Sequence, residues 1–245
     1  MSEWLAMQLL DLSLPTAAEN LALDEALLEA AEESGAPGET LRLWEPPEPM
    51  VVVGRSSRLS EEVHLEECRR RGIPVFRRTS GGAAVLTGPG CLMYAVVLSC
   101  ELRPTLRAVD HAHRFVMGKL AAALGPLVPG VSAMGTSDLA VGGRKFSGNS
   151  LRLKRDHLVY HGTLLYDFPL EMVEACLGMP PRQPDYRRGR SHASFLTNLP
   201  LTAVEIRRAL AAAWEADQPF VDWPREATAR LAAEKYSRRG WNESR

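Results

Sequence analysis

A lysine that is paired with an aspartate across a glycine turn could bind an anionic substrate. Residues 137–163 contain a Gly142–Gly143 pair between two short stretches in which apolar and polar side chains alternate. Glycine accepts the positive φ of a two-residue turn, so this pattern predicts a β-hairpin. In that hairpin Lys145 lies diagonally across from Asp138 on one face, within reach of a long side chain. Because the small Ala140 lies opposite the lysine, the ammonium group has room to hold an anionic substrate.

The expected register of this hairpin also sorts its apolar residues. It pairs Val141 with Arg144, Ala140 with Lys145, Leu139 with Phe146 and Asp138 with Ser147. The apolar members then face the core, whereas Asp138, Lys145 and Ser147 share the opposite face. By itself the pattern favours a surface ion pair that has no function, and such pairs contribute little to stability.

A second glycine-rich segment lies upstream, directly after a predicted strand. It reads Arg77-Arg78-Thr79-Ser80-Gly81-Gly82-Ala83. Guanidinium groups, hydroxyls and approachable backbone N–H groups in one place suit a phosphate or a carboxylate. The segment is neither a Walker loop nor a Rossmann fingerprint. Alone, a strand-connecting turn with two solvated arginines explains it equally well.

The composition favours a soluble globular protein and excludes several other classes. The 245 residues carry a net charge of −1, with 45% hydrophobic and 24% charged side chains. This charge gives no case for nucleic-acid binding, and no apolar run is long enough to cross a bilayer. Residues 1–4 lack the basic and apolar segments of a secretory signal. We therefore expect a cytoplasmic protein without a nucleic-acid or membrane partner.

The cysteines and histidines predict no metal site. The four cysteines (Cys68, Cys91, Cys100 and Cys176) have no CxxC spacing and no histidines at metal-ligand intervals, so we expect free, buried thiols. His111 and His113 are two residues apart on a predicted helix and therefore do not share a face.

Strands outnumber helices along the chain, and many are joined by hairpins. Strands are expected at residues 4–12, 41–44, 50–54, 73–76, 91–98 and 158–166, in addition to the hairpin. Helices are expected at residues 16–34, 60–71, 107–124, 170–177, 202–214 and 226–237. Thr16 with Glu19 would form a capping box, and Gly35 would end the first helix. This order predicts an α+β fold with a mixed, mainly antiparallel sheet flanked by helices, in a single domain over residues 1–245 with a helical tail at 220–245.

With these motifs in view, the chain resembles the lipoate-protein ligase A family, within the biotin/lipoate protein ligase superfamily. The matching segments occur in the expected order at residues 19–25, 41–44, 52–55, 77–82, 138–139, 143–149, 161–165 and 197–199. Together they cover about residues 5 to 215. The combination of Arg-Arg-x-Ser-Gly-Gly with Arg-Lys-x-Ser-Gly is specific, whereas neither half is specific alone. The resemblance implies the fold of class II synthetases and biotin-protein ligases.

The resemblance also implies a reaction. Family members activate lipoate with ATP and Mg²⁺ to lipoyl-adenylate, then transfer the acyl group to a lysine of a lipoyl-carrier protein, such as a 2-oxoacid dehydrogenase E2 subunit or a glycine cleavage H protein. Lys145 would then lie on the carboxylate and the α-phosphate, and Asp138 would orient Lys145 or the incoming amine. The adenylate and lipoate would be bordered by Arg78, Ser80, Gly81, Gly82, Ala83, Cys91, Ser147, Gly148, Ser150, His161 and Thr163. Residues 50–53 and 91–97 are candidates for the apolar slot.

The sequence departs from the family in three places. Ala83 stands where a third glycine is usual, and Cys91 replaces a ligand-contacting asparagine. The chain also ends near the point where an accessory C-terminal domain would start, so a second polypeptide could supply that domain. We expect the chain itself to be a monomer.

Two other functions remain open. One is a transferase that moves octanoyl or lipoyl groups through a cysteine thioester without ATP. Cys176 is the only cysteine downstream of His161, but its position on an apolar helix face favours a buried structural residue. The other is a non-catalytic module that binds lipoate, a nucleotide or a lipoyl domain; Lys145 argues against it.

Overall fold

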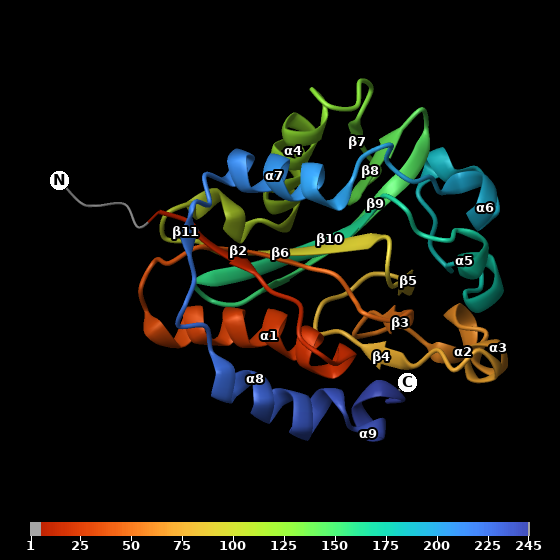
Figure 1. The fold of residues 1–245 in the computed structure, drawn as a ribbon, viewed down its shortest axis with the longest axis horizontal. Coiled ribbons are helices and arrows are strands. Elements are labelled where there is room, and N and C mark those ends of the chain that lie inside the picture. The colour runs from red at the N-terminus through yellow and green to blue at the C-terminus, as the bar shows by residue number, and fades with distance from the viewer. Residues whose placement is uncertain (1–5, 245) are drawn as a thin grey trace.

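A long mixed sheet organises the computed structural model, which describes residues 6–244 (Figure 1). Within these residues the strands of this sheet lie in the order β11-β1-β2-β6-β10-β9-β8-β7. Their bounds are β1 (Gln8–Asp11), β2 (Thr40–Trp44), β6 (Cys91–Ser99), β7 (Ser132–Met134), β8 (Asp138–Val141), β9 (Arg144–Leu153), β10 (His157–Leu165) and β11 (Gln218–Pro219). The five pairs that join β2, β6, β10, β9, β8 and β7 are antiparallel. The two pairs that β1 makes, with β11 and with β2, are parallel. The predicted mixed, mainly antiparallel α+β fold is confirmed.

A smaller sheet packs beside one end of the large one. Its strands lie in the order β4-β3-β5, with bounds β3 (Met50–Val53), β4 (Val75–Arg77) and β5 (Val85–Thr87). β3 runs parallel to β4 and antiparallel to β5. The glycine-rich segment at residues 78–83 is the connection from β4 to β5, so both of its ends are held by this sheet.

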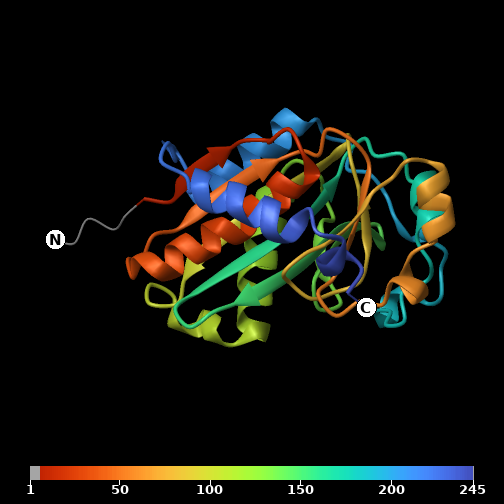
Figure 2. The ribbon, with the colours of Figure 1, turned by 90° about the horizontal axis from the view of Figure 1, so that it is seen from below.

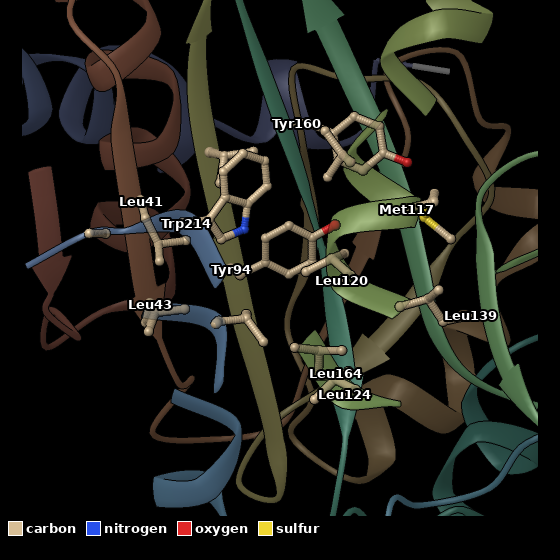
Figure 3. Packing of buried hydrophobic residues seen from close by; sticks show 14 of the residues in the cluster. Leu41, Leu43, Tyr94, Met117, Leu120, Leu124, Leu139, Tyr160, Leu164 and Trp214 are labelled. Carbon is tan, nitrogen blue, oxygen red and sulfur yellow. The ribbon is translucent and has the colours of Figure 1, made fainter. Parts of the chain in front are cut away.

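Helices cover the two faces of the large sheet differently. α4 (Val109–Leu124) and α7 (Ala203–Trp214) lie on one face, while α1 (Ala17–Ser34) and α8 (Arg225–Leu231) lie on the other (Figures 1 and 2). Between the sheet and the α4–α7 layer the core is apolar, with side chains such as Tyr94, Leu120, Leu164 and Trp214 in contact (Figure 3). The remaining helical segments are α2 (Leu59–Glu62), α3 (Leu65–Arg70), α5 (Glu171–Cys176), α6 (His192–Phe195) and α9 (Arg239–Asn242), with shorter turns at Pro104–Arg107, Asp185–Arg187 and Ala232–Tyr236.

Local sequence signals explain where α1 and α7 begin. Thr16 and Glu19 form the predicted capping box of α1, and Gly35 ends the helix at φ 62°. A second capping box, made by Thr202 and Glu205, starts α7.

Two predicted elements differ from the structure. The helix expected at residues 60–71 is divided into α2 and α3, because the N–H of His64 donates to the carbonyl of Cys176 (2.8 Å) and Val63 bridges to Leu177. These bonds to a distant segment replace helical ones. The first strand is seen as Gln8–Asp11; residues 1–5, where its predicted beginning and the signal-peptide prediction fall, lie outside the described residues.

The register of the β8–β9 hairpin is only half as predicted. Val141 pairs with Arg144 and Ala140 with Lys145, as expected, but a β-bulge then shifts the pairing by one residue. Leu139 therefore pairs with Ser147, and Asp138 pairs with Gly148. The predicted Leu139–Phe146 and Asp138–Ser147 pairs are wrong, because one extra residue on β9 is left without a cross-strand partner.

The C-terminal segment is tied to α1 through a buried carboxylate. Glu25 accepts hydrogen bonds from Lys235 (2.7 Å) and from the Tyr236 hydroxyl (2.8 Å), and it also pairs with Arg152 of β9 (2.8 Å). Burial alone would raise the pKa of Glu25, but these donors outweigh it and lower the pKa below its ordinary value.

None of the helices among residues 6–244 is both long and apolar enough to span a membrane.

Candidate active site

Lys145 and Asp138 form an ion pair at the bulge of the β8–β9 hairpin. Lys145 Nζ lies 2.7 Å from Asp138 Oδ1, and the two side chains are 24% and 10% exposed. The other carboxylate oxygen of Asp138 accepts a hydrogen bond from the Tyr186 hydroxyl (2.8 Å). Burial, together with the negative charge of Asp138, raises the pKa of Tyr186, so the hydroxyl stays a donor. Asp138 is thus fixed from two sides, by Lys145 and by Tyr186.

Gly148 leaves the space that the Lys145 side chain occupies. A Cβ atom at this position would lie 2.8 Å from Lys145 Nζ, so any larger residue would displace the ammonium. The N–H of Gly148 points the other way and donates to Thr163 Oγ1 on β10 (3.2 Å). The Arg-Lys-x-Ser-Gly motif is therefore explained by the space that its lysine needs.

Arg78 braces the glycine-rich loop from inside. Its guanidinium is buried and donates to the carbonyls of Val52 (3.0 Å), Gly81 (2.5 Å) and Ala83 (3.0 Å). Burial lowers the pKa of Arg78 to about 10. Gly82 lies over Gly54 so closely that a Cβ at Gly54 would come within 1.9 Å of its carbonyl oxygen. The loop thus has a defined shape, held by a buried cation and a glycine contact.

Arg77 anchors the same loop to the end of the chain. Its guanidinium donates to the carbonyls of Gly54 (2.7 Å) and Ser57 (2.9 Å), and its own carbonyl accepts from the indole N–H of Trp241 (2.8 Å). Neither of the paired arginines is a solvated surface residue, because both are buried.

A chain of four buried polar side chains, which we call the relay, runs from the glycine-rich loop across the sheet to α1. It consists of Ser80, His161, Asp24 and Arg42, which are 2%, 8%, 3% and 0% exposed. Ser80 Oγ lies 2.5 Å from His161 Nε2, and His161 Nδ1 lies 3.3 Å from Asp24 Oδ2. Arg42 donates to Asp24 Oδ1 (2.5 Å) and also to the backbone carbonyl of Asn20 (2.7 Å).

An apolar cavity of ≈ 100 Å³ has Lys145 in its wall and lies between β5, β9, β10 and the helices α5 and α6. Its walls are mainly the side chains of Val85, Leu86, Leu165, Val173, Leu177, Phe195 and Leu196. Lys145 lines it together with Thr163, and Glu62, Arg187 and His192 add further polar groups. An apolar space with a cation in its wall can accommodate a short chain that ends in an acid.

The structure brings most of the predicted site residues together. Those that line the cavity are Ala83, Lys145, Ser147, Gly148 and Thr163. Ser80 and His161 belong to the relay, and Ser150 Oγ donates to the Gly81 carbonyl (2.9 Å), next to Gly82 and Arg78. Asp138 contacts the cavity only through Lys145.

Cys91 and the predicted slot residues Met50–Val53 do not line the cavity, but they belong to the same apolar cluster as wall residues such as Leu86, Leu165 and Phe195. The Cys91 side chain is fully buried at the start of β6. Burial raises the pKa of Cys91 to about 12. The cavity walls come instead from β5 and from residues 165–196, which the sequence analysis did not select because their apolar pattern is that of ordinary core.

Sequence reasoning also missed Asp24, Arg42 and Tyr186 as site residues. Asp24 and Arg42 were noticed only as parts of matching segments, although a charged residue inside an apolar strand such as Thr40–Trp44 is a signal for a buried ion pair. Tyr186 lies in a Pro- and Arg-rich loop that gave no such signal. Within residues 6–244, no three His, Cys, Asp or Glu side chains are grouped so that they could hold a metal ion.

Comparison with known proteins places these motifs in a family. The model of the lipoyl protein ligase A/B catalytic domain matches residues 16–212. A putative lipoate-protein ligase A of Aeropyrum pernix is 35% identical over 146 residues, which are 60% of this chain and 52% of that protein. An octanoyltransferase LipM of Geobacillus kaustophilus is 27% identical over 265 aligned residues, covering 92% of this chain and 94% of that one. This chain thus spans about half the length of the ligase relative and nearly the whole length of the transferase.

Solved structures agree on the fold. A bi-partite lipoate protein ligase of Thermoplasma acidophilum superposes with a TM-score of 0.80 at 22% identity, covering 98% of this chain and 96% of that one. A lipoate-protein ligase A bound with ATP gives 0.79 at 21% identity, with 98% and 99% covered. The fold is that of the lipoate-protein ligases, and with its glycine-rich loop and Lys145 hairpin in the matched region, the chain belongs to the lipoyl protein ligase A/B catalytic domain family.

Proposed function

We propose that this protein uses ATP to activate lipoate, or a similar short acyl acid, as an acyl-adenylate and then transfers the acyl group to a lysine of a lipoyl-carrier protein. The observation that carries the proposal is the position of Lys145, which lines an apolar cavity beside a braced glycine-rich loop. The cavity would hold the alkyl chain and dithiolane, and the lysine would meet the carboxylate.

Lys145 would act on the charge that develops during activation. The acid oxygen attacks the α-phosphorus of ATP, a P–O bond to pyrophosphate breaks, and negative charge accumulates around both groups. A preorganised cation at that point stabilises the transition state, typically by about 3–4 kcal/mol for one donor. Asp138 and Tyr186 keep this cation in place.

The glycine-rich loop would border the phosphate and the ribose side of the adenylate. Arg78 uses its donors on the loop's own carbonyls, so its role is to shape the loop rather than to touch a ligand directly. Gly81 and Gly82 would then offer backbone N–H groups at close approach, and Ser147, Gly148 and Ser150 would border the other side. ATP would enter with Mg²⁺ as a co-substrate.

The partner is inferred from the relatives. The Thermoplasma acidophilum ligase is described as bi-partite and together with its E2 lipoyl domain. We extend both features to this chain: the acceptor is an apo lipoyl domain, and a separate polypeptide supplies an accessory domain where transfer requires one.

An ATP-independent octanoyl or lipoyl transferase is the second candidate, favoured by the near full-length match to LipM. Its thioester chemistry needs an accessible thiolate. All four cysteines are buried, none lines the cavity, and burial raises the pKa of Cys176 as well as that of Cys91. These thiols are poorly suited to the task.

One assay separates the candidates. The protein is incubated with apo lipoyl domain and either lipoate with MgATP or octanoyl-carrier protein without ATP, and products are identified by mass spectrometry. We expect lipoyl-adenylate in the first mixture, and acylated domain there once any accessory polypeptide is present. Acylated domain in the second mixture alone would establish the transferase instead.

A further inference from the structure

The relay has the order hydroxyl, imidazole, carboxylate, which is an arrangement that moves protons. We propose that His161, oriented by Asp24, accepts the proton released when the carrier lysine attacks the acyl-adenylate, and that Ser80 conveys this proton. His161 and Ser80 would then be catalytic and Asp24 a positioning residue. The inference rests on the proposed function and assigns one of its two half-reactions to the relay.

The contacts of Asp24 fix which ring nitrogen of His161 is the acceptor. An ionised carboxylate only accepts hydrogen bonds, so the nitrogen 3.3 Å from it, Nδ1, carries the proton. In the neutral imidazole Nε2 is then the acceptor, and it faces Ser80 Oγ at 2.5 Å. Arg42 holds the other oxygen of Asp24, so the carboxylate cannot rotate away.

Ser80 is hydrogen-bonded so that it can pass a proton on. A hydroxyl has one donor and two acceptor positions. Its proton goes to His161 Nε2, and Arg78 Nε donates to one lone pair (3.1 Å). The second lone pair is left for the N–H of an incoming amine, and the side chain of His161, 10% exposed, is the most open point of the relay.

The relay lies near the cavity, although none of its four residues lines it. His161 and Thr163 are two residues apart on β10 and so share a face, roughly 7 Å from each other along the strand. Thr163 lines the cavity, and so does Ala83, which lies three residues beyond Ser80 on the loop. Thr163 and Ala83 therefore link the relay to the cavity wall that includes Lys145.

Proton balance decides which half-reaction needs the relay. Activation joins a carboxylate to phosphorus and releases no proton. A carrier lysine is an ammonium at neutral pH, with an ordinary pKa of about 10.4, and its nitrogen must lose two protons to form an amide. The first is lost to solvent before the attack and frees the amine, and the second is lost as the C–N bond forms. As the C–N bond forms and the C–O bond to AMP breaks, AMP leaves with the bonding electrons. The proton from nitrogen passes to Ser80 Oγ while the Ser80 proton passes to His161 Nε2.

Other groups at the cavity are less suited to this role. Lys145 is a paired cation, and Asp138 already accepts from Lys145 and Tyr186. Glu62 accepts the N–H of Ala84 (2.6 Å). His192 remains as a rival acceptor, because its Nε2 faces the Gly178 carbonyl (3.1 Å) and its Nδ1 is then unprotonated.

The test separates the two half-reactions in single turnovers. The full chain is given lipoate and MgATP, and adenylate formation is followed by pyrophosphate release. The adenylate is then offered either apo lipoyl domain, with the accessory polypeptide where needed, or hydroxylamine, a reactive nucleophile that traps an acyl-adenylate without an enzymic base. The variants are His161→Gln, Asp24→Asn and Ser80→Ala, compared with His192→Gln. His113→Gln, a half-buried histidine bonded to Tyr160 on the opposite face of the sheet, is the control.

We expect His161→Gln to slow transfer to the lipoyl domain by about 10²-fold or more, with little change in adenylate formation, in trapping by hydroxylamine or in the KM for the domain. Asp24→Asn should show the same split. His161→Gln leaves the Arg42–Asp24 pair intact, so it keeps the test decisive if Asp24→Asn does not fold. A loss shared equally by both half-reactions, unchanged transfer, or a split seen in His192→Gln instead would overturn the proposal. Absence of adenylate from the wild type would reject the proposed function itself.

Discussion

Strand β10 carries two different environments on its two faces. All nine of its residues are buried, yet alternate side chains meet opposite surroundings. Leu158, Tyr160 and Leu164 point to the α4–α7 layer, where their neighbours are apolar (Figure 3). His161 and Thr163 point to the α1 side, where the relay and the cavity lie.

The difference comes from what each helix layer supplies. α4 and α7 present mainly apolar side chains such as Leu120 and Leu210, which need no hydrogen bonds from the sheet. α1 presents Asp24 and Glu25 from its buried face, and each is matched by cations or donors from distant segments. A fully buried strand can therefore belong to a site, because burial of a polar face is tolerated where every charge is paired.

The largest effect on activity is expected from a substitution of Lys145, on the cavity side of the sheet. Lys145→Ala should lower adenylate formation by about 10²- to 10³-fold, because it removes the cation that meets the developing charge. Pyrophosphate release measures this, and circular dichroism should show an unchanged fold. The matched control is Lys119→Ala on the α4–α7 side, where the ammonium caps the Ala213 carbonyl (2.6 Å). Equal losses in both variants would contradict the assignment.

A substitution on the apolar face should instead lower the stability and leave the activity of the folded protein unchanged. Leu164→Ala removes a fully buried side chain and should lower the free energy of unfolding by about 3 kcal/mol. Activity per folded molecule should stay near that of the wild type, as measured by urea denaturation together with the adenylation assay. Leu164→Met, which conserves volume, should cost less than about 1.5 kcal/mol. A variant that stays stable but inactive would show that the two faces are not separate.

Much of this arrangement could be predicted from the sequence, because its signals are local. The capping box at Thr16, the turn at Gly142–Gly143 and the alternation along β8 and β9 depend on neighbouring residues, and the structure confirms the elements they predict. The Lys145–Asp138 contact was predicted for the same reason and is observed.

What failed depends on contacts between distant segments. The break between α2 and α3 is made by Cys176 and Leu177, more than a hundred residues away. The bulge on β9 shifts the pairing between Leu139 and Ala140, and the walls of the cavity come from segments whose patterns resemble any core. Asp24 gains its partners only when α1 packs across β2 and β10.

A buried charge on the α1 side offers a graded test of the same comparison. Glu25→Gln should lower the free energy of unfolding at neutral pH by about 2 kcal/mol, because Lys235 and Arg152 lose their carboxylate. The pKa of Glu25 is lowered by folding, so its stabilisation is present above the ordinary value of 4.5 and is lost as the pH falls through the folded-state pKa. The difference between wild type and variant should therefore shrink in acid, as followed by urea denaturation at several pH values. Glu66→Gln, at an exposed pair on α3, should change little, and a constant difference at all pH values would refute the linkage.

The smallest effect is expected from the hydroxyl that holds Asp138. Tyr186→Phe removes one donor from the carboxylate, which should weaken the positioning of Lys145 and slow adenylate formation about fivefold, or about 1 kcal/mol. Tyr166→Phe is the matched control, because that hydroxyl binds Glu45 away from the cavity (2.7 Å). Since the lysine itself remains, the loss must be far smaller than in Lys145→Ala. A loss of equal size would mean that Tyr186, rather than the ammonium, is the group on which activation depends.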